Sequence, residues 1–312
     1  MTTTSFQYID AGGHTFSVAT ASKRTLTGYS GMGMPPAEYF WQQMPDRDGS
    51  QYLGHRFGNR TVNIVVMDCA TDRTDAWSNA GSYHQAFNPT LGRGTLRATL
   101  PDGTTRDLMC RIVDGLGFDT EERLPPTINQ QPIQLISEEP HWRDSNQNVE
   151  TFTLTAGTNT DVYCTVGGDV ESWPRITIEQ TSGTLAHPVV EVLETSDKVD
   201  LDVNLTNQEW LVIESDTPSV TRSNGSALMG SATTSSVFFS LARGPNTLRF
   251  TAGTGCGTGT VRWKDRYTGL YIVPTTTTEV TWTRGYDQFD VQWNQSTDTF
   301  TKGTSTLSES WS

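Results

Sequence analysis

RTVNIVVMD, residues 60–68, alternates apolar and polar side chains and sets the character of the first half of the chain. Val62, Ile64 and Val66 fall on one face of an extended segment, because successive side chains of a strand point to opposite sides. This alternation predicts a half-buried β-strand. The residues on either side of it decide what the strand packs against.

The segment directly after this strand has helical periodicity. Its apolar residues recur at spacings of three and four and form one stripe: Ala76, Trp77, Ala80, Tyr83 and Phe87. Thr71 or Asp72 can cap the start, and Asn88-Pro89 stops the helix. We therefore expect one clear helix, at about 72–87.

A hairpin follows the predicted helix. Two alternating runs flank the turn Pro101-Asp102-Gly103 and contain Leu96, Ala98, Leu100, Leu108, Cys110 and Ile112. PIQLISEEPHW (132–142) is a further predicted strand, after a polar loop at 115–130. With residues 1–58 interpreted as short strands and long loops, this order indicates a small barrel or sheet with one helix. RDSNQN (143–148) is the predicted end of this first domain, 1–148.

The second half of the chain has a different pattern, with short strands at close intervals and no helical stretch. Nine segments are visible: TFTLT, VYCTV, RITIEQ, VVEVL, KVDLDVNL, EWLVIE, SVFFSL, NTLRFT and TVRWKDRY. They predict a two-sheet jelly-roll sandwich over 149–268. The remainder, 269–312, is rich in Thr and Ser but contains Trp282, Trp293 and Trp311. We expect an extended arm ordered by a neighbouring subunit or partner, the alternative being that it extends its own sandwich.

Charge and hydropathy exclude several classes of protein. The formal net charge is −13, which disfavours sequence-specific binding of nucleic acid. No apolar stretch approaches the length of a membrane span, so membrane insertion is not expected. The N-terminus, MTTTSFQYIDAGG, has neither a basic leader nor an apolar core, and we expect no signal peptide.

The four cysteines stand alone in the sequence, at Cys69, Cys110, Cys164 and Cys256. In a reducing compartment isolated cysteines are expected to be buried small hydrophobic residues. A Cys69–Cys110 disulfide is the alternative.

No segment carries a complete chemical motif. DLDVN (200–204) begins like a calcium loop, but Leu205 and Leu211 stand where that loop needs glycine and a carboxylate, so a half-buried strand is expected. GTGCGTGT (253–260) leads into a strand without a Lys, which indicates a loop or a close backbone approach at a sheet edge.

Isolated titratable residues do not assemble into a site either. The five histidines, His14, His55, His84, His141 and His187, show no metal-ligand spacing. Carboxylates such as Glu138, Glu139 and Asp144 could be paired as in a glycosidase only arbitrarily. The sequence therefore predicts a non-enzymatic protein without catalytic residues, cofactor or metal.

The second half resembles a known family in the order of its phrases. GGDVESWPRITIEQTSGTLAHPVV (167–190) is followed by DKVDLDVNLTNQEWLVIESD (197–216), FSLARGPNTLRFTAGTG (239–255) and VRWKDRYTG (261–269). This succession is similar to the C-terminal half of siphophage distal tail proteins. The strand, helix and hairpin of the first half match that family in order.

The resemblance implies a fold and an assembly. The fold would be all-β, with a split-barrel-like N-terminal domain that includes one helix and a galectin-like C-terminal sandwich. The function implied is a structural ring of six copies at the virion tail tip, assembled in the host cytoplasm. That ring would join the tail tube protein to the hub or tip protein and let DNA pass. The tape measure and receptor-binding proteins would be further partners.

A carbohydrate-binding module is the alternative from another class, and a glycan depolymerase ranks third. Jelly-roll sandwiches bind sugars through exposed aromatic rings, and Trp173, Trp210, Trp263 and Trp282 are available. Trp210 and Trp263 lie in alternating strands, where burial is expected.

Overall fold

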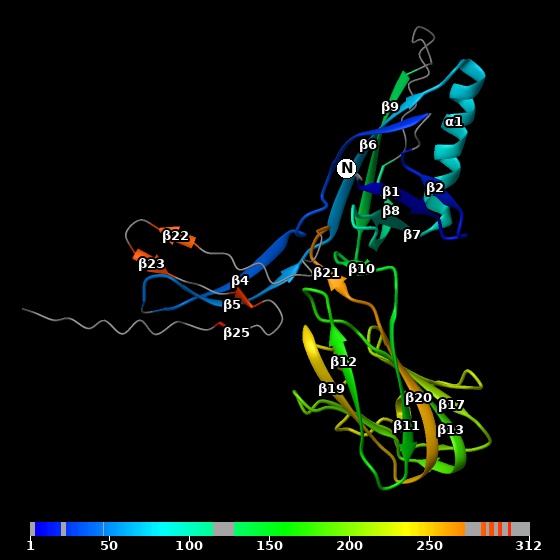
Figure 1. Cartoon of the computed structure of the whole chain (residues 1–312), viewed down its shortest axis with the longest axis vertical. Coiled ribbons are helices and arrows are strands. Elements are labelled where there is room, and N and C mark those ends of the chain that lie inside the picture. Colours follow the sequence, from blue (N-terminus) through cyan, green and yellow to red (C-terminus); the bar gives the residue numbers. More distant parts are fainter. Residues whose placement is uncertain are drawn as a thin grey trace, which may run out of the picture. The chain divides into compact units, whose positions relative to one another are not determined.

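The computed structural model describes residues 4–19, 23–45, 47–114 and 128–271, and the backbone of four short strands beyond them. The chain divides into two compact units, residues 1–270 and 271–312. The first unit contains two hydrophobic cores. We call the body around the N-terminal core the N-terminal lobe and the body around the other core the sandwich (Figure 1). The predicted all-β class with a single helix is confirmed.

The N-terminal lobe is built on an antiparallel sheet of nine strands. Seven run in the order β2 (Thr15–Ser17), β1 (Ser5–Ile9), β7 (Gly94–Thr99), β8 (Thr105–Ile112), β9 (Ile128–Ser137), β6 (Arg60–Cys69) and β3 (Arg24–Ser30). β10 (Trp142–Asp144) pairs with β8 and with β21 (Arg266–Tyr267). Val62, Ile64 and Val66 on β6 are all buried, and β7 and β8 form the predicted hairpin. Both sequence predictions are confirmed.

Helix α1 (Arg73–Ala86) covers this sheet with one face. The Asp72 carboxylate caps it by accepting a hydrogen bond from the Asp75 amide at 2.8 Å. The buried rings of Tyr83 and Phe87 pack against Phe16, with ring centroids 4.9 Å and 5.3 Å away. A short 3-10 turn, η1 (Pro89–Leu91), follows the helix.

One residue of the predicted apolar stripe was assigned wrongly. Trp77 is 57% exposed, whereas Ala80, Tyr83 and Phe87 are buried. At 100° per residue Trp77 lies about 120° around the helix from Tyr83, outside the narrow face that meets the sheet. The packed stripe therefore excludes it.

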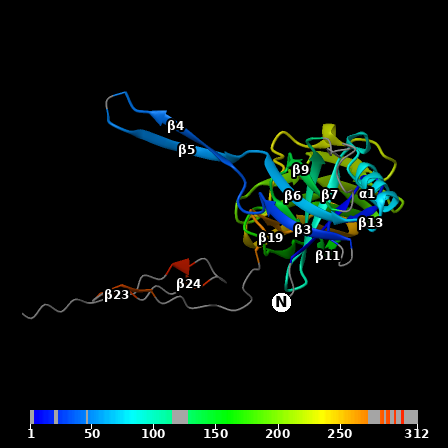
Figure 2. The same cartoon turned by 90° about the horizontal axis from the view of Figure 1, so that it is seen from above.

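Residues 37–57 form a long hairpin that the sequence did not predict. Among the described strands, β4 (Ala37–Gln43) pairs with β5 (Ser50–Phe57) alone, with a register shift between Phe40 and Trp41. Figures 1 and 2 both show the pair running away from the nine-stranded sheet. The expectation of short strands and long loops fails here, because almost every residue of the hairpin is exposed and no buried face imposes alternation.

The sandwich consists of two antiparallel sheets, as predicted. The first runs β11 (Asn148–Thr155), β20 (Thr254–Trp263), β13 (Arg175–Ala186), β17 (Trp210–Glu214) and β18 (Ser219–Arg222), with β16 (Asn204–Leu205) also on β13. The second runs β12 (Thr160–Val166), β19 (Gly244–Thr251), β14 (Val189–Val192) and β15 (Lys198–Asp200). SVFFSL (236–241) forms no strand and follows the 3-10 turn η2 (Met229–Ser231), which corrects one of the nine predicted segments.

The two segments tested for ligand loops are structural. The alternation of burial is as expected, because Val199, Leu201, Val203 and Leu205 are all buried. The expected single strand is wrong, since β15 ends at Asp200 and β16 begins at Asn204 on the other sheet. The glycine run 253–260 lies mostly inside β20, between β11 and β13, and not at a sheet edge. A Cβ atom on Gly259 would lie 2.3 Å from Cζ of Phe152. The expected close approach is therefore present, but at the centre of a sheet.

All four cysteines are free thiols, so the alternative of a Cys69–Cys110 disulfide is wrong. Cys110 and Cys164 are buried, and burial raises the pKa of each thiol to about 12. Cys69 and Cys256 are only partly buried, so the expectation of four buried thiols holds for two of them.

The ends of the predicted domains stay predictions. β21 returns the chain to the nine-stranded sheet, and Tyr267 belongs to the N-terminal core. In the second unit the backbone forms two short pairs, β22 (Trp282–Arg284) with β23 (Asp287–Phe289) and β24 (Trp293–Asn294) with β25 (Thr299–Phe300). The rest of the predicted arm, and residues 115–127 of the predicted loop, lie outside the described residues. No helix of the described chain has the length and apolar character of a membrane span.

Candidate functional site

Three surfaces could serve an assembly protein: the junction between lobe and sandwich, the exposed hairpin, and an outer groove of the sandwich. The junction is formed where β10 and β21 connect the two bodies. Its residues are Arg60, His141, Arg143, Asp169, Arg266 and Thr268.

Arg60, at the start of β6, is the centre of the junction. Only 1% of its surface is exposed, and its guanidinium donates to four backbone carbonyls. The acceptors come from three distant segments: Gly31 (2.8 Å), Gly33 (2.5 Å), Pro140 (2.5 Å) and Thr268 (2.5 Å). Burial lowers the pKa of Arg60 to about 10, so the guanidinium remains charged at neutral pH.

His141 is the buried histidine of the junction. Its Nδ1 accepts a hydrogen bond from the Arg266 guanidinium at 2.9 Å, which requires a neutral ring. Burial, and then the charges of Arg266 and Arg60, lower the pKa of His141 to about 4. Thr268 completes the contact, because its amide and its hydroxyl both donate to the Asp169 carboxylate, at 2.8 Å and 2.5 Å.

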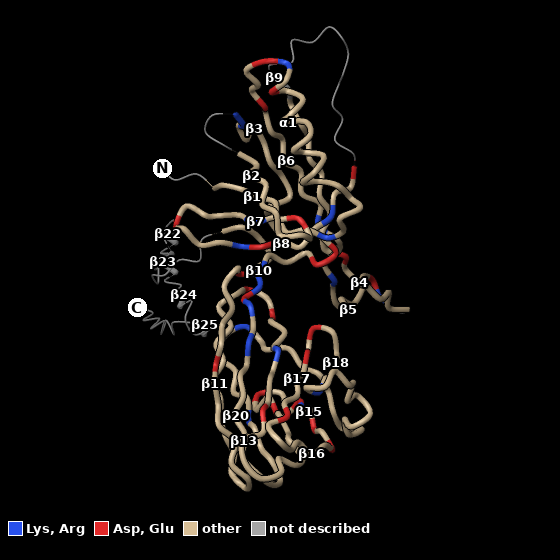
Figure 3. Tube along the Cα trace, turned by 90° about the vertical axis from the view of Figure 1, so that its right-hand side faces the viewer, with Lys and Arg blue, Asp and Glu red and all other residues tan. Residues whose placement is uncertain are grey.

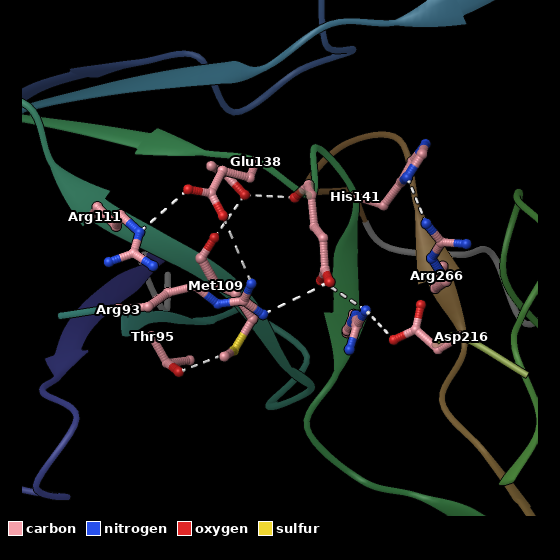
Figure 4. Close-up of polar contacts among 11 residues, drawn as sticks. Arg93, Thr95, Met109, Arg111, Glu138, His141, Asp216 and Arg266 are labelled. Carbon is pink, nitrogen blue, oxygen red and sulfur yellow. Dashed lines mark hydrogen bonds and ion pairs between the residues drawn. The ribbon is translucent and has the colours of Figure 1, made fainter. Parts of the chain in front are cut away.

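A chain of ion pairs runs from the N-terminal lobe to the sandwich (Figure 4). Glu138 pairs with Arg111 at 3.2 Å. Arg143 pairs with Glu139 at 2.6 Å and with Asp216, in the turn between β17 and β18, at 3.4 Å. Figure 3 shows basic and acidic positions side by side around β8 and β10. These groups are partly exposed, so they orient the connection more than they stabilise it.

The hairpin presents aromatic side chains to solvent on a two-stranded sheet. Three of its exposed rings, those of Tyr39, Trp41 and Tyr52, lie together with centroids 5.3 Å to 6.5 Å apart, and we call them the hairpin face. Trp41 is 59% exposed, and its ring centroid lies 5.3 Å from that of Tyr52. An exposed apolar group of this size commonly marks a contact with another protein.

The third surface is a groove of about 960 Å³ on the sandwich, beside the neighbouring edge strands β11 and β12. Its lining includes hydroxyl and carboxylate groups from Thr151, Thr153, Asp161, Tyr163, Glu179 and Thr258. Among the described residues, no Lys or Arg lines it. Asp161 is fixed by Arg249, which donates to both of its oxygens at 2.8 Å and 2.9 Å.

Each of the carboxylates named in the sequence analysis has a partner within the structure. Glu138 and Glu139 are engaged by arginines, and Asp144 Oδ1 accepts from the Asn146 amide at 3.0 Å. Among the described residues, no three His, Cys, Asp or Glu side chains gather as a metal site requires. The absence of catalytic, cofactor-binding and metal-binding residues remains a prediction.

Sequence reasoning missed both the junction and the hairpin face. Every residue has a backbone carbonyl, so the sequence cannot show which carbonyls accept hydrogen bonds from Arg60. The hairpin had one usable signal, the density of aromatic residues in AEYFWQQ (37–43). Trp263 is buried as expected, but Trp210 is 38% exposed, so that expectation was wrong. Its strand is covered on the inner face of its sheet, and Trp210 points to the other face.

Comparison with known proteins finds a family match within the sandwich. Residues 167–267 match the family of the siphovirus-type tail component, C-terminal domain. The solved structure of the Dit protein of phage SPP1, described as a paradigm of the hub adsorption apparatus in phages that infect Gram-positive bacteria, is similar. The two structures superpose with a TM-score of 0.63 at 12% sequence identity. The match covers 84% of this chain and 98% of the SPP1 chain.

A chain of the phage P2 baseplate, in its activated conformation with calcium, has a TM-score of 0.49 at 8% identity, with the same coverage. No curated protein sequence matches this chain. The resemblance to siphophage distal tail proteins is thus confirmed by a family match over 167–267 and by the fold shared with SPP1 Dit.

Proposed function

We propose that this protein is a structural component of a siphovirus tail that forms a ring of six copies at the distal end of the tail tube. The observation that carries the proposal is the match of residues 167–267 to a siphovirus tail-component domain. The fold shared with SPP1 Dit, a hub protein, supports the distal position. The protein acts through contacts, not through catalysis.

The hairpin supports self-assembly. An isolated pair of strands is marginally stable in water, and among the described residues no strand pairs with the outer edge of β4 or of β5. A second copy of the chain can cover the hairpin face and pair with an open edge. When each copy gives its hairpin to the next and the rotation closes, the product is a ring with cyclic symmetry.

The other parts of the proposal follow from position and charge. A formal net charge of −13 per copy makes the ring acidic, so DNA can pass through it without adhering. The tail tube protein would contact one side of the ring and the hub or tip protein the other. Tape measure and receptor-binding proteins would be further partners, and assembly would take place in the host cytoplasm.

Mass measurement and imaging test this function. Purified full-length protein is analysed by light scattering and negative-stain microscopy, alone and with a tail tube protein of the same phage. We expect closed rings of six, at least on the tube. Antibody labelling of virions should mark the tail tip. Labelling along the tube or on the capsid would refute the proposal.

A further inference from the structure

The outer face of the sandwich carries a row of side chains that the structural role does not use. Trp210 on β17 lies opposite Glu179 on β13, Glu179 lies opposite Thr258 on β20, and Thr258 lies opposite Thr153 on β11. Directly opposed residues project from the same face of a sheet. All four are exposed, with Trp210 at one end.

The row leads into the groove beside β11 and β12. Thr153, Glu179 and Thr258 are part of its lining, and Tyr163, which is 73% exposed, lies on β12. Strands in a sheet are spaced by about 4.8 Å, so the row alone spans about 14 Å. That length suits a short oligosaccharide better than a single sugar ring.

The chemistry of the row selects the class of ligand. Threonine hydroxyls donate and accept hydrogen bonds, as sugar hydroxyls do, and carboxylates accept strong charge-assisted ones. Within the described chain, the Glu179 carboxylate and the Thr258 hydroxyl have no hydrogen-bond or ion-pair partner, so they are available to a ligand. The rings of Trp210 and Tyr163 offer apolar faces to the C–H side of a sugar.

Charge excludes the anionic alternatives. Of the residues that the structure describes, three carboxylates line the groove, from Glu150, Asp161 and Glu179, and no Lys or Arg does. Arg249 lies beside it, but its Nε and Nη2 atoms both donate to the Asp161 carboxylate. A protein partner would favour a continuous apolar centre. Here the two exposed aromatic residues are separated by polar ones.

We propose that this face, Trp210–Glu179–Thr258–Thr153 with the adjoining groove, is a binding site for a neutral oligosaccharide. The site is independent of ring formation, since it lies on the sandwich and needs no second copy. The sequence argued against sugar binding because burial was expected for Trp210 and Trp263. The exposure of Trp210 removes that objection for one of the two rings.

Titration of the full-length protein with neutral oligosaccharides of glucose, galactose, N-acetylglucosamine and rhamnose tests the site, with saturation-transfer NMR and calorimetry as readouts. We expect at least one to bind, and both Trp210→Ala and Glu179→Gln to weaken its affinity about tenfold or more. The matched controls are Trp77→Ala on α1 and Glu171→Gln, both at exposed positions outside the face. Neither control should change the affinity.

Four results would overturn the site. They are failure of every neutral sugar to bind, equal loss in the control variants, and binding restricted to an anionic polymer such as polyglycerol phosphate. The fourth is that Trp210→Ala abolishes the binding of another tail protein and leaves the binding of every sugar unchanged. Because Trp210 is at the surface, its variant should fold. Thr258→Val is a second variant of the same face, and it should also weaken sugar binding. Ring mass is measured separately, so failure here leaves the ring proposal intact.

Discussion

Nη2 of Arg60 donates a hydrogen bond to the backbone carbonyl of Thr268 at 2.5 Å, joining residues 208 positions apart in the chain. Thr268 in turn donates to Asp169 of the sandwich through its amide and its hydroxyl. One buried side chain of the N-terminal lobe therefore holds the segment by which the chain leaves the sandwich.

Replacing Arg60 with Met should destabilise the fold strongly. The substitution removes the buried guanidinium that binds the carbonyls of Gly31, Gly33, Pro140 and Thr268, and we expect the free energy of unfolding to fall by about 3–5 kcal/mol. Chemical denaturation monitored by tryptophan fluorescence measures this loss. Arg56→Met, at an exposed ion pair with Glu38, is the control and should change stability by less than about 0.5 kcal/mol. A loss of similar size in both variants would contradict this account of Arg60.

Stability should decrease as the pH is lowered from about 6.5 to about 4, because of His141. The folded protein holds His141 neutral, with a pKa of about 4, whereas in the unfolded chain the pKa is near its usual 6.5. In this window the unfolded state binds a proton that the folded state does not, so the free energy of unfolding falls by about 3 kcal/mol. Above the window this contribution is complete.

The His141→Gln variant isolates that contribution. Denaturation is measured at about pH 7 and about pH 4.5 for wild type, His141→Gln and the control His84→Gln, at an exposed position of α1. The pH-dependent loss should shrink in the first variant and persist in the second. Identical pH profiles for all three proteins would show that His141 is not responsible.

The hairpin face should be needed for assembly and not for folding. The double variant Trp41→Ser/Tyr52→Ser removes exposed apolar surface, so we expect an unfolding free energy within about 0.5 kcal/mol of wild type. Ring formation on the tail tube should be lost, as measured by light scattering and microscopy. Trp77→Ser, at another exposed tryptophan, should leave assembly intact. Rings of normal mass from the double variant would exclude the hairpin from the contact.

Two glycine-to-alanine substitutions should have opposite signs. A Cβ at position 259 would lie 2.3 Å from Cζ of Phe152 and 2.4 Å from the Thr177 carbonyl oxygen, so Gly259→Ala should cost about 1–3 kcal/mol. Gly81 lies within α1 with nothing within 4 Å of its added Cβ, and Gly81→Ala should stabilise by about 0.5–1 kcal/mol. Thermal unfolding measures both changes. Destabilisation by Gly81→Ala would indicate a contact on that side of the helix.

The sequence predicts those elements that have one buried and one solvated face. β6, β7, β8 and α1 follow from alternation and from a stripe that a sheet covers. Residues 37–57 escape prediction because both faces of their hairpin are exposed, so nothing sorts polar from apolar residues. Trp77 and Trp210 were predicted wrongly for a related reason. Periodicity assigns a residue to one face of an element, but it does not say how much of that face the packing partner covers. The junction depends on carbonyl acceptors and leaves no pattern at all.

The return of the chain through β21 has a consequence for the order of folding on the ribosome. Tyr267 and Thr268, which complete the core and the Arg60 cluster of the N-terminal lobe, are translated after every strand of the sandwich. The part of the protein that is synthesised first is therefore finished last. During translation the nine-stranded sheet lacks β21 until the end, whereas all strands of the sandwich are already available to form its core. The contacts of Tyr267 and Thr268 that join the two bodies can form only after residues near 270 have left the exit tunnel.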